Sequence, residues 1–280
     1  MNPDTPPTDA QPMNDLPTCY RCHSTPCKCR DRVTLYEAEA EDVLPLIPHR
    51  SVDLVLTDPP YSSGGLHRSD RNQKTAAKYR HTNVLKYNPD FAGDSRDQRA
   101  LALWFSHWMR LALHTTRPGG VLACFIDWRN IAAAVDAVQV AGWTYRGLLV
   151  WDKTEAARPS MAWFRSQSEF LVLGSRGPIG RHQSEAAGRC SPGVLRHYLA
   201  PGQKHHLTAK PVALLEDVIT TRDEWQTILD PFAGSGTTGL AAKKLARRAI
   251  LAEHDPNYLA TATRLLAQDA QQYLPLGPNP

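Results

Sequence analysis

The stretch DPFAGSGTTG at residues 230–239 constrains the fold of this chain more than any other. Its glycines follow the spacing G-x-G-x-x-G, which normally comes directly after a strand of a nucleotide-binding α/β domain and opens the next helix. Only 41 residues follow Gly239, and these are too few to supply the other strands of such a domain. The remaining strands must therefore lie earlier in the chain.

Short β-branched and apolar runs supply these strands. QTILD at 226–230 and AILAEH at 249–254 flank the glycine turn, while VTLYEA at 33–38 and SVDLVLT at 51–57 lie near the start of the chain. We expect the two early strands to be the third and fourth strands of the same sheet. The domain is then circularly permuted, which is tolerated because domain termini often lie close together at the surface.

The rest of the chain alternates between helical and strand patterns. A short helix broken at Pro45 follows the first strand. We further predict helices at 99–115, 129–141, 210–221, 236–246 and 256–269. Strands are predicted at 121–127, 147–153 and 168–175, and the sequence RPGG at 117–120 is predicted to form a turn. This alternation is typical of an α/β fold with a doubly wound, mostly parallel sheet, and the last two strands are expected to form its antiparallel end.

Composition excludes a membrane protein. The sequence has no run of 18 apolar residues, and its polar, proline-rich start lacks the features of a signal peptide. We therefore expect a cytoplasmic protein with no membrane partner. Residues 1–18 and 271–280 are predicted to be tails, and residues 31–270 the main domain.

Four of the six cysteines crowd into CYRCHSTPCKC, as Cys19, Cys22, Cys27 and Cys29. In a chain without export signals, such a cluster favours a metal site over disulfides. The C-x-x-C and C-x-C pairs predict a zinc knuckle at 19–30, in which His23 is an alternative ligand. A poorly ordered tail with free thiols is the competing interpretation.

Basic residues are concentrated in two stretches that lack helix or strand periodicity. Residues 62–99 carry eight Lys and Arg against four Asp, and residues 176–210 carry six Lys and Arg, four His and one acid. Segments 62–98 and 176–207 are thus predicted to be irregular loops that contact a polyanion, although solvated surface loops would have the same composition.

The glycine turn alone is compatible with more than one ligand. A Walker P-loop requires Gly-Lys-Ser/Thr, whereas Leu240 follows Gly239. A dinucleotide and S-adenosylmethionine both remain, because each would use Glu253, the acid at the end of the next strand, to bind ribose hydroxyls.

TDPPY at 57–61 decides between them, because it follows a buried strand, where ligands meet open parallel sheets. Pro59 and Pro60 hold the backbone rigid and leave carbonyls free to accept hydrogen bonds. Asp58 adds a further acceptor and Tyr61 a flat apolar face. These four residues are the predicted catalytic set, and they suit an exocyclic amine on an aromatic base.

With these motifs, the chain resembles the amino-group DNA methyltransferases that depend on S-adenosylmethionine. TDPPY resembles their catalytic motif, DPFAGSGTTG their cofactor loop, and HHLTAKP their H-P-T-x-K-P element, with Leu207 in place of proline. The order of the motifs resembles the permuted β group. The resemblance covers roughly residues 33–270 and implies a Rossmann-like methyltransferase fold, double-stranded DNA as the substrate, and base flipping.

The resemblance also implies a set of cofactor-binding residues. Glu253 would bind the ribose hydroxyls and Glu39 would lie near the adenine, while Thr208 and Lys210 would close the methionine pocket. The glycine turn would pass the methionine part of the cofactor through Asp230, Phe232, Gly234, Gly236 and Thr237.

Within such a family, an aspartate at the first motif position favours adenine-N6 methylation, so Asp58 predicts that base over cytosine-N4. A catalytically silent DNA-binding protein on the same scaffold and an NAD-dependent oxidoreductase are the alternatives from other functional classes. A homodimer and a restriction endonuclease partner are further open alternatives.

Overall fold

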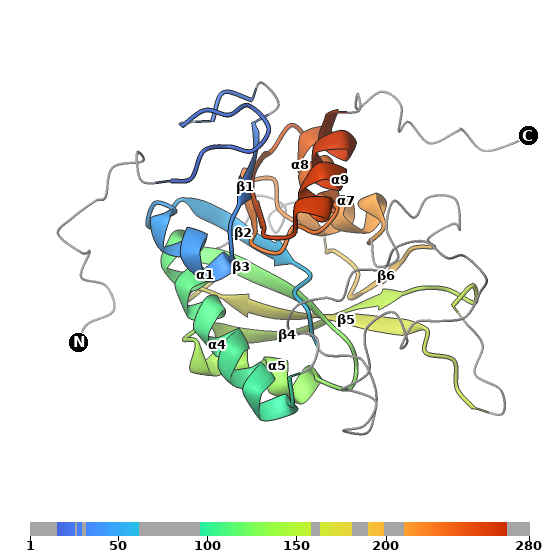
Figure 1. Ribbon diagram of the computed structural model, residues 1–280. Helices are drawn as coiled ribbons and strands as arrows, with labels where there is room; N and C mark the ends of the chain where they lie inside the picture. Colours follow the sequence, from blue (N-terminus) through green and yellow to red (C-terminus); the bar gives the residue numbers. More distant parts are fainter. Residues whose placement is uncertain are drawn as a thin grey trace, which may run out of the picture.

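The computed structural model describes residues 16–25, 27–29, 32–61, 96–157, 163–180, 190–198 and 210–267. Their centre is one mixed sheet with the strand order β1-β8-β7-β2-β3-β5-β4-β6 (Figure 1). In chain order, the strands are β1 (Val33–Glu37), β2 (Val52–Thr57), β3 (Thr116–Ile126), β4 (Thr144–Asp152), β5 (Ser168–Ser175), β6 (Val194–Arg196), β7 (Thr227–Asp230) and β8 (Arg248–Glu253).

The strand order confirms the permuted domain. The early strand β1 pairs in parallel with β8, and the early strand β2 pairs in parallel with β7. β7 and β8 are themselves parallel neighbours. The two strands that flank the glycine turn therefore lie between the two strands from the start of the chain, and all four belong to one sheet, as predicted.

The antiparallel end of the sheet is also confirmed. β5 runs antiparallel to both β3 and β4. The prediction that 176–207 is wholly irregular is wrong at β6, which pairs in parallel with β4. With three residues, of which only Leu195 is buried, β6 is too short to show a strand pattern in the sequence.

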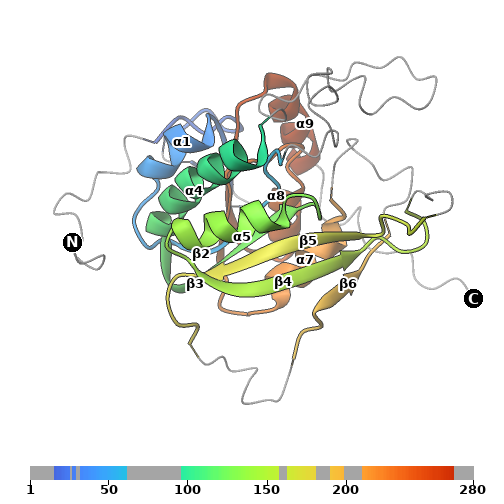
Figure 2. The same ribbon diagram turned by 90° about the horizontal axis from the view of Figure 1, so that it is seen from below.

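Helices cover both faces of the sheet, as Figures 1 and 2 show. One face carries α1 (Ala40–Val43), the 3₁₀ turn η2 (Leu44–Leu46), α4 (Gln98–Thr115) and α5 (Ile131–Val140). The other carries α7 (Val212–Thr220), α8 (Thr237–Lys244) and α9 (Pro256–Ala267). The helix expected around Pro45 is thus an α-turn followed by a 3₁₀ turn.

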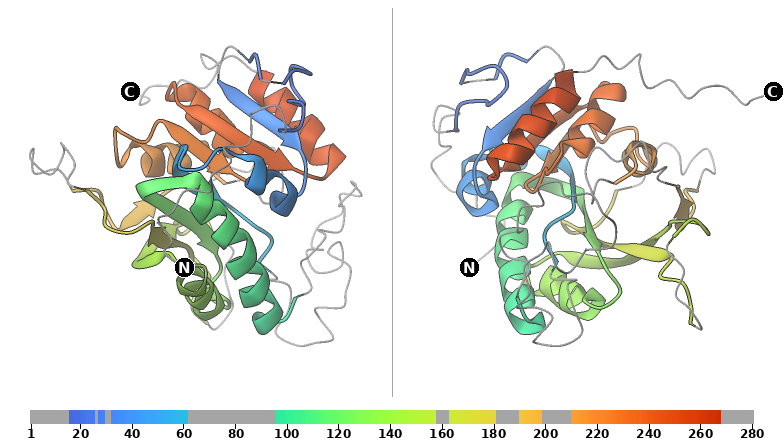
Figure 3. Two further views of the ribbon diagram at one scale, coloured as in Figure 1. Left: turned by 90° about the vertical axis from the view of Figure 1, so that its left-hand side faces the viewer. Right: turned by 45° about the vertical axis from the view of Figure 1, so that its right-hand side comes forward.

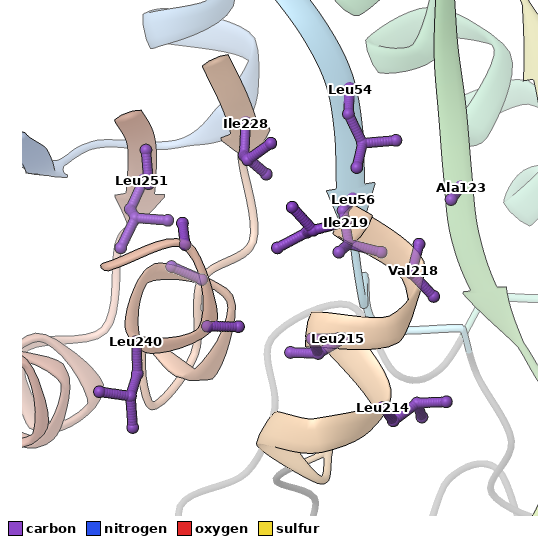
Figure 4. Packing of buried hydrophobic residues seen from close by; sticks show 14 of the residues in the cluster. Leu54, Leu56, Ala123, Leu214, Leu215, Val218, Ile219, Ile228, Leu240 and Leu251 are labelled. Atoms are coloured by element: carbon purple, nitrogen blue, oxygen red, sulfur yellow. The ribbon is translucent and has the colours of Figure 1, made fainter. Parts of the chain in front are cut away.

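Alternating residues of β2 serve the two cores. Leu54 and Leu56 are buried in the cluster formed with α7 and α8, whereas Val55 is buried against α4 and α5. Figure 4 shows Ile219 of α7 beside Leu56 of β2. A strand buried on both faces is typical of a parallel sheet between helix layers, which Figure 3 shows from two further directions.

One predicted turn lies inside a strand. RPGG at 117–120 belongs to β3, which begins at Thr116 rather than at residue 121. The pairing of β2 with β3 shifts register between Val52 and Leu54, and Gly119 has φ +76°. The turn residues are therefore absorbed as an irregularity of the strand. Among the described residues, no helix is long and apolar enough to cross a membrane.

Candidate active site

The adjacent parallel strands β2 and β7 bring the two motifs to the same edge of the sheet. β2 ends at Thr57, directly before Asp58, and β7 ends at Asp230. The Thr57 hydroxyl donates a hydrogen bond of 2.6 Å to Asp230 Oδ1. TDPPY and the segment DPFAGSGTTG are far apart in the sequence, but a hydrogen bond between their first residues joins them at this edge.

The Asp58 carboxyl has one bonded and one free oxygen. Lys210 Nζ donates to Oδ2 at 2.5 Å. The side chain is 26% exposed, yet Oδ1 is buried and has no hydrogen-bond partner among the described residues. Burial raises the pKa of the Asp58 carboxyl to about 6, because lost hydration outweighs the attraction of Lys210, and the Glu169 carboxylate raises it further. A buried acceptor without a hydrogen-bond donor is costly in free energy, so Oδ1 is placed to accept a hydrogen bond from a ligand.

Lys210 is buried and shared between two carboxylates. Its Nζ lies 3.0 Å from Glu169 Oε1 on β5, in addition to its bond with Asp58. Glu169 has a second cation, Lys153, at 3.6 Å. Burial alone would raise the pKa of Glu169, but the charges of Lys210 and Lys153 outweigh burial and lower it. Glu169 therefore stays ionised, and Asp58 is the carboxyl that can take up a proton near neutral pH.

Tyr61 is fixed at both ends. Its hydroxyl donates to Glu169 Oε1 at 3.0 Å, and its carbonyl accepts a hydrogen bond of 2.7 Å from the side-chain amide of Asn130. Between Asp58 and Tyr61, Pro59 is buried and Pro60 half-buried, so the segment has a fixed φ at two positions and no N–H to satisfy there. The tyrosine ring is thus held in one orientation next to Asp58.

Glu169, Lys153 and Asn130 were missed from the sequence. The available signal was the acid in the apolar strand SEFLVLGS, because a buried carboxylate requires a cation or several donors. Lys210 was predicted to close the methionine pocket, and that role stays a prediction; in the structure its ammonium group donates a hydrogen bond to the carboxyl of Asp58.

Glu253 organises the glycine turn. Its Oε2 accepts from the backbone N–H of Gly234 at 2.8 Å, and its Oε1 accepts from those of His254 and Asp255, each at 2.9 Å. Burial raises the pKa of Glu253, and these backbone N–H groups oppose that effect. The carboxylate thus ties the turn after β7 to the end of β8.

Asp230 is held by neutral donors as well. Besides Thr57, the backbone N–H of Phe232 donates to Oδ1 at 3.1 Å. Burial raises the pKa of Asp230 to about 6, more than the hydrogen bonds from the side chains of Thr238 and Thr57 lower it. The Phe232 ring packs on the rings of Trp104 and Trp108, with centroids 5.5 Å and 5.2 Å away, so it anchors the turn to α4.

The two glycines of the turn have different surroundings. Both have positive φ, +52° at Gly234 and +83° at Gly236. A Cβ on Gly236 would lie 2.9 Å from Ala262 Cβ on α9, whereas a Cβ on Gly234 would have no atom within 4 Å. Gly236 therefore permits packing, and Gly234 borders open space. Thr237 begins α8, with its hydroxyl 3.2 Å from that of Ser235.

Glu39 and Glu253 both lie near the ring of His254. It is the N-cap residue of α1, and His254 Nδ1 lies 3.8 Å from Glu39 Oε2 and 3.4 Å from Glu253 Oε1. Thr208 and nearly all of the predicted DNA-contacting segment 62–98 lie outside the described residues, as does more than half of 176–207. The sulfur atoms of the four N-terminal cysteines lie within 4.8 Å of one another, remote in the sequence from these motifs.

The family model N6_N4_Mtase, described as DNA methylase, matches residues 52–264. The type II methyltransferase M2.DpnII from Streptococcus pneumoniae is 25% identical over 253 residues, which cover 85% of this chain and 90% of the relative. Two solved structures share the fold. The M1.HpyAVI-SAM complex has a TM-score of 0.59 at 22% identity, with 84% of this chain and 100% of that one covered. For the cytosine-N4-specific PvuII DNA methyltransferase, the TM-score is 0.63 at 18% identity, with coverages of 85% and 87%.

These matches confirm the resemblance seen in TDPPY and the glycine turn, and with it the Rossmann-like methyltransferase fold. The family model spans both motifs and the sheet between them, so the match concerns the region that holds the site. The chain belongs to the N6/N4 DNA methylase family.

Proposed function

We propose that the protein transfers a methyl group from S-adenosylmethionine to the N6 amine of adenine in double-stranded DNA. The observation that carries the proposal is Asp58 Oδ1, a buried carboxylate oxygen without a partner among the described residues, beside the fixed ring of Tyr61. An exocyclic amine offers the donor that this oxygen lacks, and its ring offers a face to Tyr61.

The residues around the glycine turn fit the cofactor. Gly234 borders open space, and Glu253 and Glu39 lie on either side of His254, where carboxylates can accept from ribose hydroxyls and the adenine amine. Asp230 lies at the end of β7 without a cation among its described partners, which suits a positively charged ligand. When bound, S-adenosylmethionine supplies an electrophilic methyl group on a sulfonium. The M1.HpyAVI structure is a complex with SAM, which supports the same cofactor here.

Asp58 and the Pro59 carbonyl would activate the amine. An aromatic amine is a poor nucleophile because its lone pair is delocalised into the ring. These oxygens accept hydrogen bonds from the two N–H groups of the amine and so draw its nitrogen toward tetrahedral geometry. The lone pair is then localised on the nitrogen and can attack the methyl carbon. Transfer leaves one surplus proton on the nitrogen, and Asp58, with a pKa of about 6, can hold it. Catalysis then rests on orientation and electrostatics, once the base has been flipped out of the duplex.

The choice of adenine rests on Asp58 at the first position of the motif. A cytosine-N4 amine has the same chemistry, and the PvuII enzyme shows that this fold also serves it. The name of the type II relative M2.DpnII supports a role in restriction–modification. A restriction endonuclease partner and a homodimer stay predictions.

The test is methylation of DNA of mixed sequence with S-adenosylmethionine labelled in its methyl group, followed by digestion to nucleosides. We expect N6-methyladenine from the wild type and from Asp136→Ala, an exposed control on α5. Asp58→Ala should lower the rate of transfer by about 10²–10³-fold while binding the cofactor normally. N4-methylcytosine as the product would overturn the adenine assignment. Intact cofactor binding without methylation of any base would favour a silent DNA-binding scaffold.

A further inference from the structure

We infer that Cys19, Cys22, Cys27 and Cys29 hold a structural zinc ion that fastens the N-terminal segment to the outer edge of the sheet. Their four sulfur atoms lie within 4.8 Å of one another. The ligand set contains no histidine: His23, the alternative from the sequence, is not part of this group. The site is independent of the methyl-transfer chemistry, so the inference does not rest on the proposed function.

The sulfur separations match a tetrahedral metal site. Cys19 Sγ lies 3.9 Å from Cys29 Sγ, and Cys22 Sγ lies 3.8 Å from Cys27 Sγ. Four thiolates about 2.3 Å from a zinc ion are separated from one another by about 3.8 Å. A disulfide requires about 2.0 Å, and all four cysteines are free thiols. Both pairs therefore have the spacing of zinc ligands.

The backbone around the sulfurs supports the same assignment. The N–H of Lys28 points to Cys22 Sγ at 3.3 Å, and that of Cys29 points to Cys27 Sγ at 3.4 Å. Metal ligands are usually oriented by such secondary hydrogen bonds, which also offset the charge of thiolates. A tight turn closes the first pair, because the N–H of His23 donates to the carbonyl of Cys19 at 2.8 Å. The loop is thus shaped around its sulfur atoms.

The knuckle is attached to β1, the first strand in the order of the sheet. The N–H of Tyr20 donates to the carbonyl of Leu35 at 2.6 Å, and the Arg21 side chain donates to the carbonyl of Val33 at 2.6 Å. Cys19 is buried, and Tyr20 packs against the core. Figures 1 and 3 show this segment, in dark blue, beside β1.

This attachment gives the metal a role. An edge strand presents unpaired backbone groups, which proteins cover to prevent pairing with other chains. A segment of this length has no core of its own and needs a metal or a covalent link to hold its shape. The zinc ion would supply that constraint, and through Tyr20 and Arg21 it would hold β1, which ends two residues before Glu39.

The experiment is metal analysis of the purified full chain by mass spectrometry. We expect about one zinc ion per chain, retained in the exposed control Cys190→Ser and lost in the double variant Cys22→Ser/Cys27→Ser. Replacement of zinc by cobalt(II) in the wild type should give the thiolate charge-transfer and visible bands of a tetrahedral site. Because the wild type and cobalt measurements need no variant, failure of the double variant to fold would leave the test intact.

Hydrogen exchange connects the metal to the sheet. Removal of zinc from the wild type with a chelator should speed exchange at the amides of Cys19 and Tyr20 by at least about tenfold, and exchange in β5 should not change. A wild type grown with zinc that contains less than a fifth of an ion per chain would overturn the inference. So would cysteines that resist alkylation until they are reduced, because these would be disulfides. Failure of methyl transfer would leave these readings unaffected.

Discussion

The two halves of the site use carboxylates in opposite ways. In the half formed by β7 and β8, Asp230 and Glu253 accept hydrogen bonds from the Thr57 hydroxyl and from backbone N–H groups, which are neutral donors. The partly exposed ring of His254 also lies 3.4 Å from Glu253. In the half formed by β2 and β5, Asp58 and Glu169 share the ammonium group of Lys210. Neutral donors leave the negative charge of these carboxylates in place for a cationic cofactor. Lys210 and Lys153 instead balance the negative charges of Asp58 and Glu169, where an uncharged base would bind. Both halves contain buried carboxylates, and they differ in whether the groups that bond these carboxylates are neutral or positively charged.

The largest expected effect comes from removing the cation of the β2–β5 half. Lys210→Met leaves Asp58 and Glu169 buried without their shared partner, so we expect a loss of about 3–5 kcal/mol in the free energy of unfolding. The measurement is denaturant unfolding near neutral pH. The variant should regain part of this loss at low pH, where the two carboxyl groups are protonated.

Lys244→Met is the matched control. Its ammonium group lies 2.6 Å from Glu216 Oε1, but its side chain is 20% exposed, against 8% for Lys210, so we expect a smaller loss than in Lys210→Met. Equal losses in the two variants would mean that the charges near Asp58 are balanced by something other than Lys210.

A second prediction separates packing from ligand binding within the glycine turn. Gly236→Ala adds a Cβ at 2.9 Å from Ala262 Cβ and at φ +83°, so it should lower the free energy of unfolding by about 2–3 kcal/mol. Gly234→Ala meets no neighbour within 4 Å and should cost about 1 kcal/mol for its positive φ. Its new methyl group enters the open space, so cofactor affinity should fall more than stability. Unfolding and cofactor titration of both variants provide the measurement, and a reversal of the two phenotypes would contradict it.

A third prediction concerns Glu253. In Glu253→Gln, one of the two acceptor oxygens becomes a donor and faces backbone N–H groups of the turn. We expect cofactor affinity to fall by about 10–100-fold, as for a lost charge-assisted hydrogen bond. The rate at saturating cofactor should be nearly unchanged, because Glu253 does not contact TDPPY in the described structure. A drop in that rate with normal cofactor affinity would contradict the prediction, because Glu253 would then act in methyl transfer and not in cofactor binding.

The acids at the strand ends of both halves were predictable from the sequence. Asp58, Asp230 and Glu253 each lie at or directly after the end of a buried strand, and parallel strands of one sheet end at the same edge. That the early strands belong to the same sheet followed from the position of the glycine turn, which leaves too few residues after it for the other strands. These are local patterns with a fixed geometric consequence.

The charge partners of Asp58 could not be predicted in the same way. Glu169 reaches the site through the antiparallel pairing of β5 with β3 and β4, in which Glu169 lies opposite Trp151. That register is set by packing across the sheet and has no signature in the spacing of residues. The three-residue strand β6 was missed for a similar reason, since it is defined by pairing with β4.

The smallest expected effect is a pH dependence that distinguishes the same two halves. The pKa of Asp58 is raised to about 6, mainly by burial, so below that pH its carboxyl already carries a proton and cannot take up the one that methyl transfer releases from the amine. We expect the single-turnover rate at saturating cofactor to fall about tenfold per pH unit below about pH 6. Asp230 also has a pKa of about 6 from burial, and its protonation should instead weaken cofactor binding.

Unfolding would not explain this loss of activity through Asp58. The unfolded carboxyl binds its proton near the ordinary value of 3.8, and the folded one binds it at about 6. The folded state therefore binds more protons between these values, and through this group stability rises as pH falls. Rates measured across this window, together with unfolding at each pH, separate the two effects. A rate that stays constant through pH 6 at saturating cofactor would show that ionised Asp58 is not required, and the contrast between the halves would then reside in Lys210 alone.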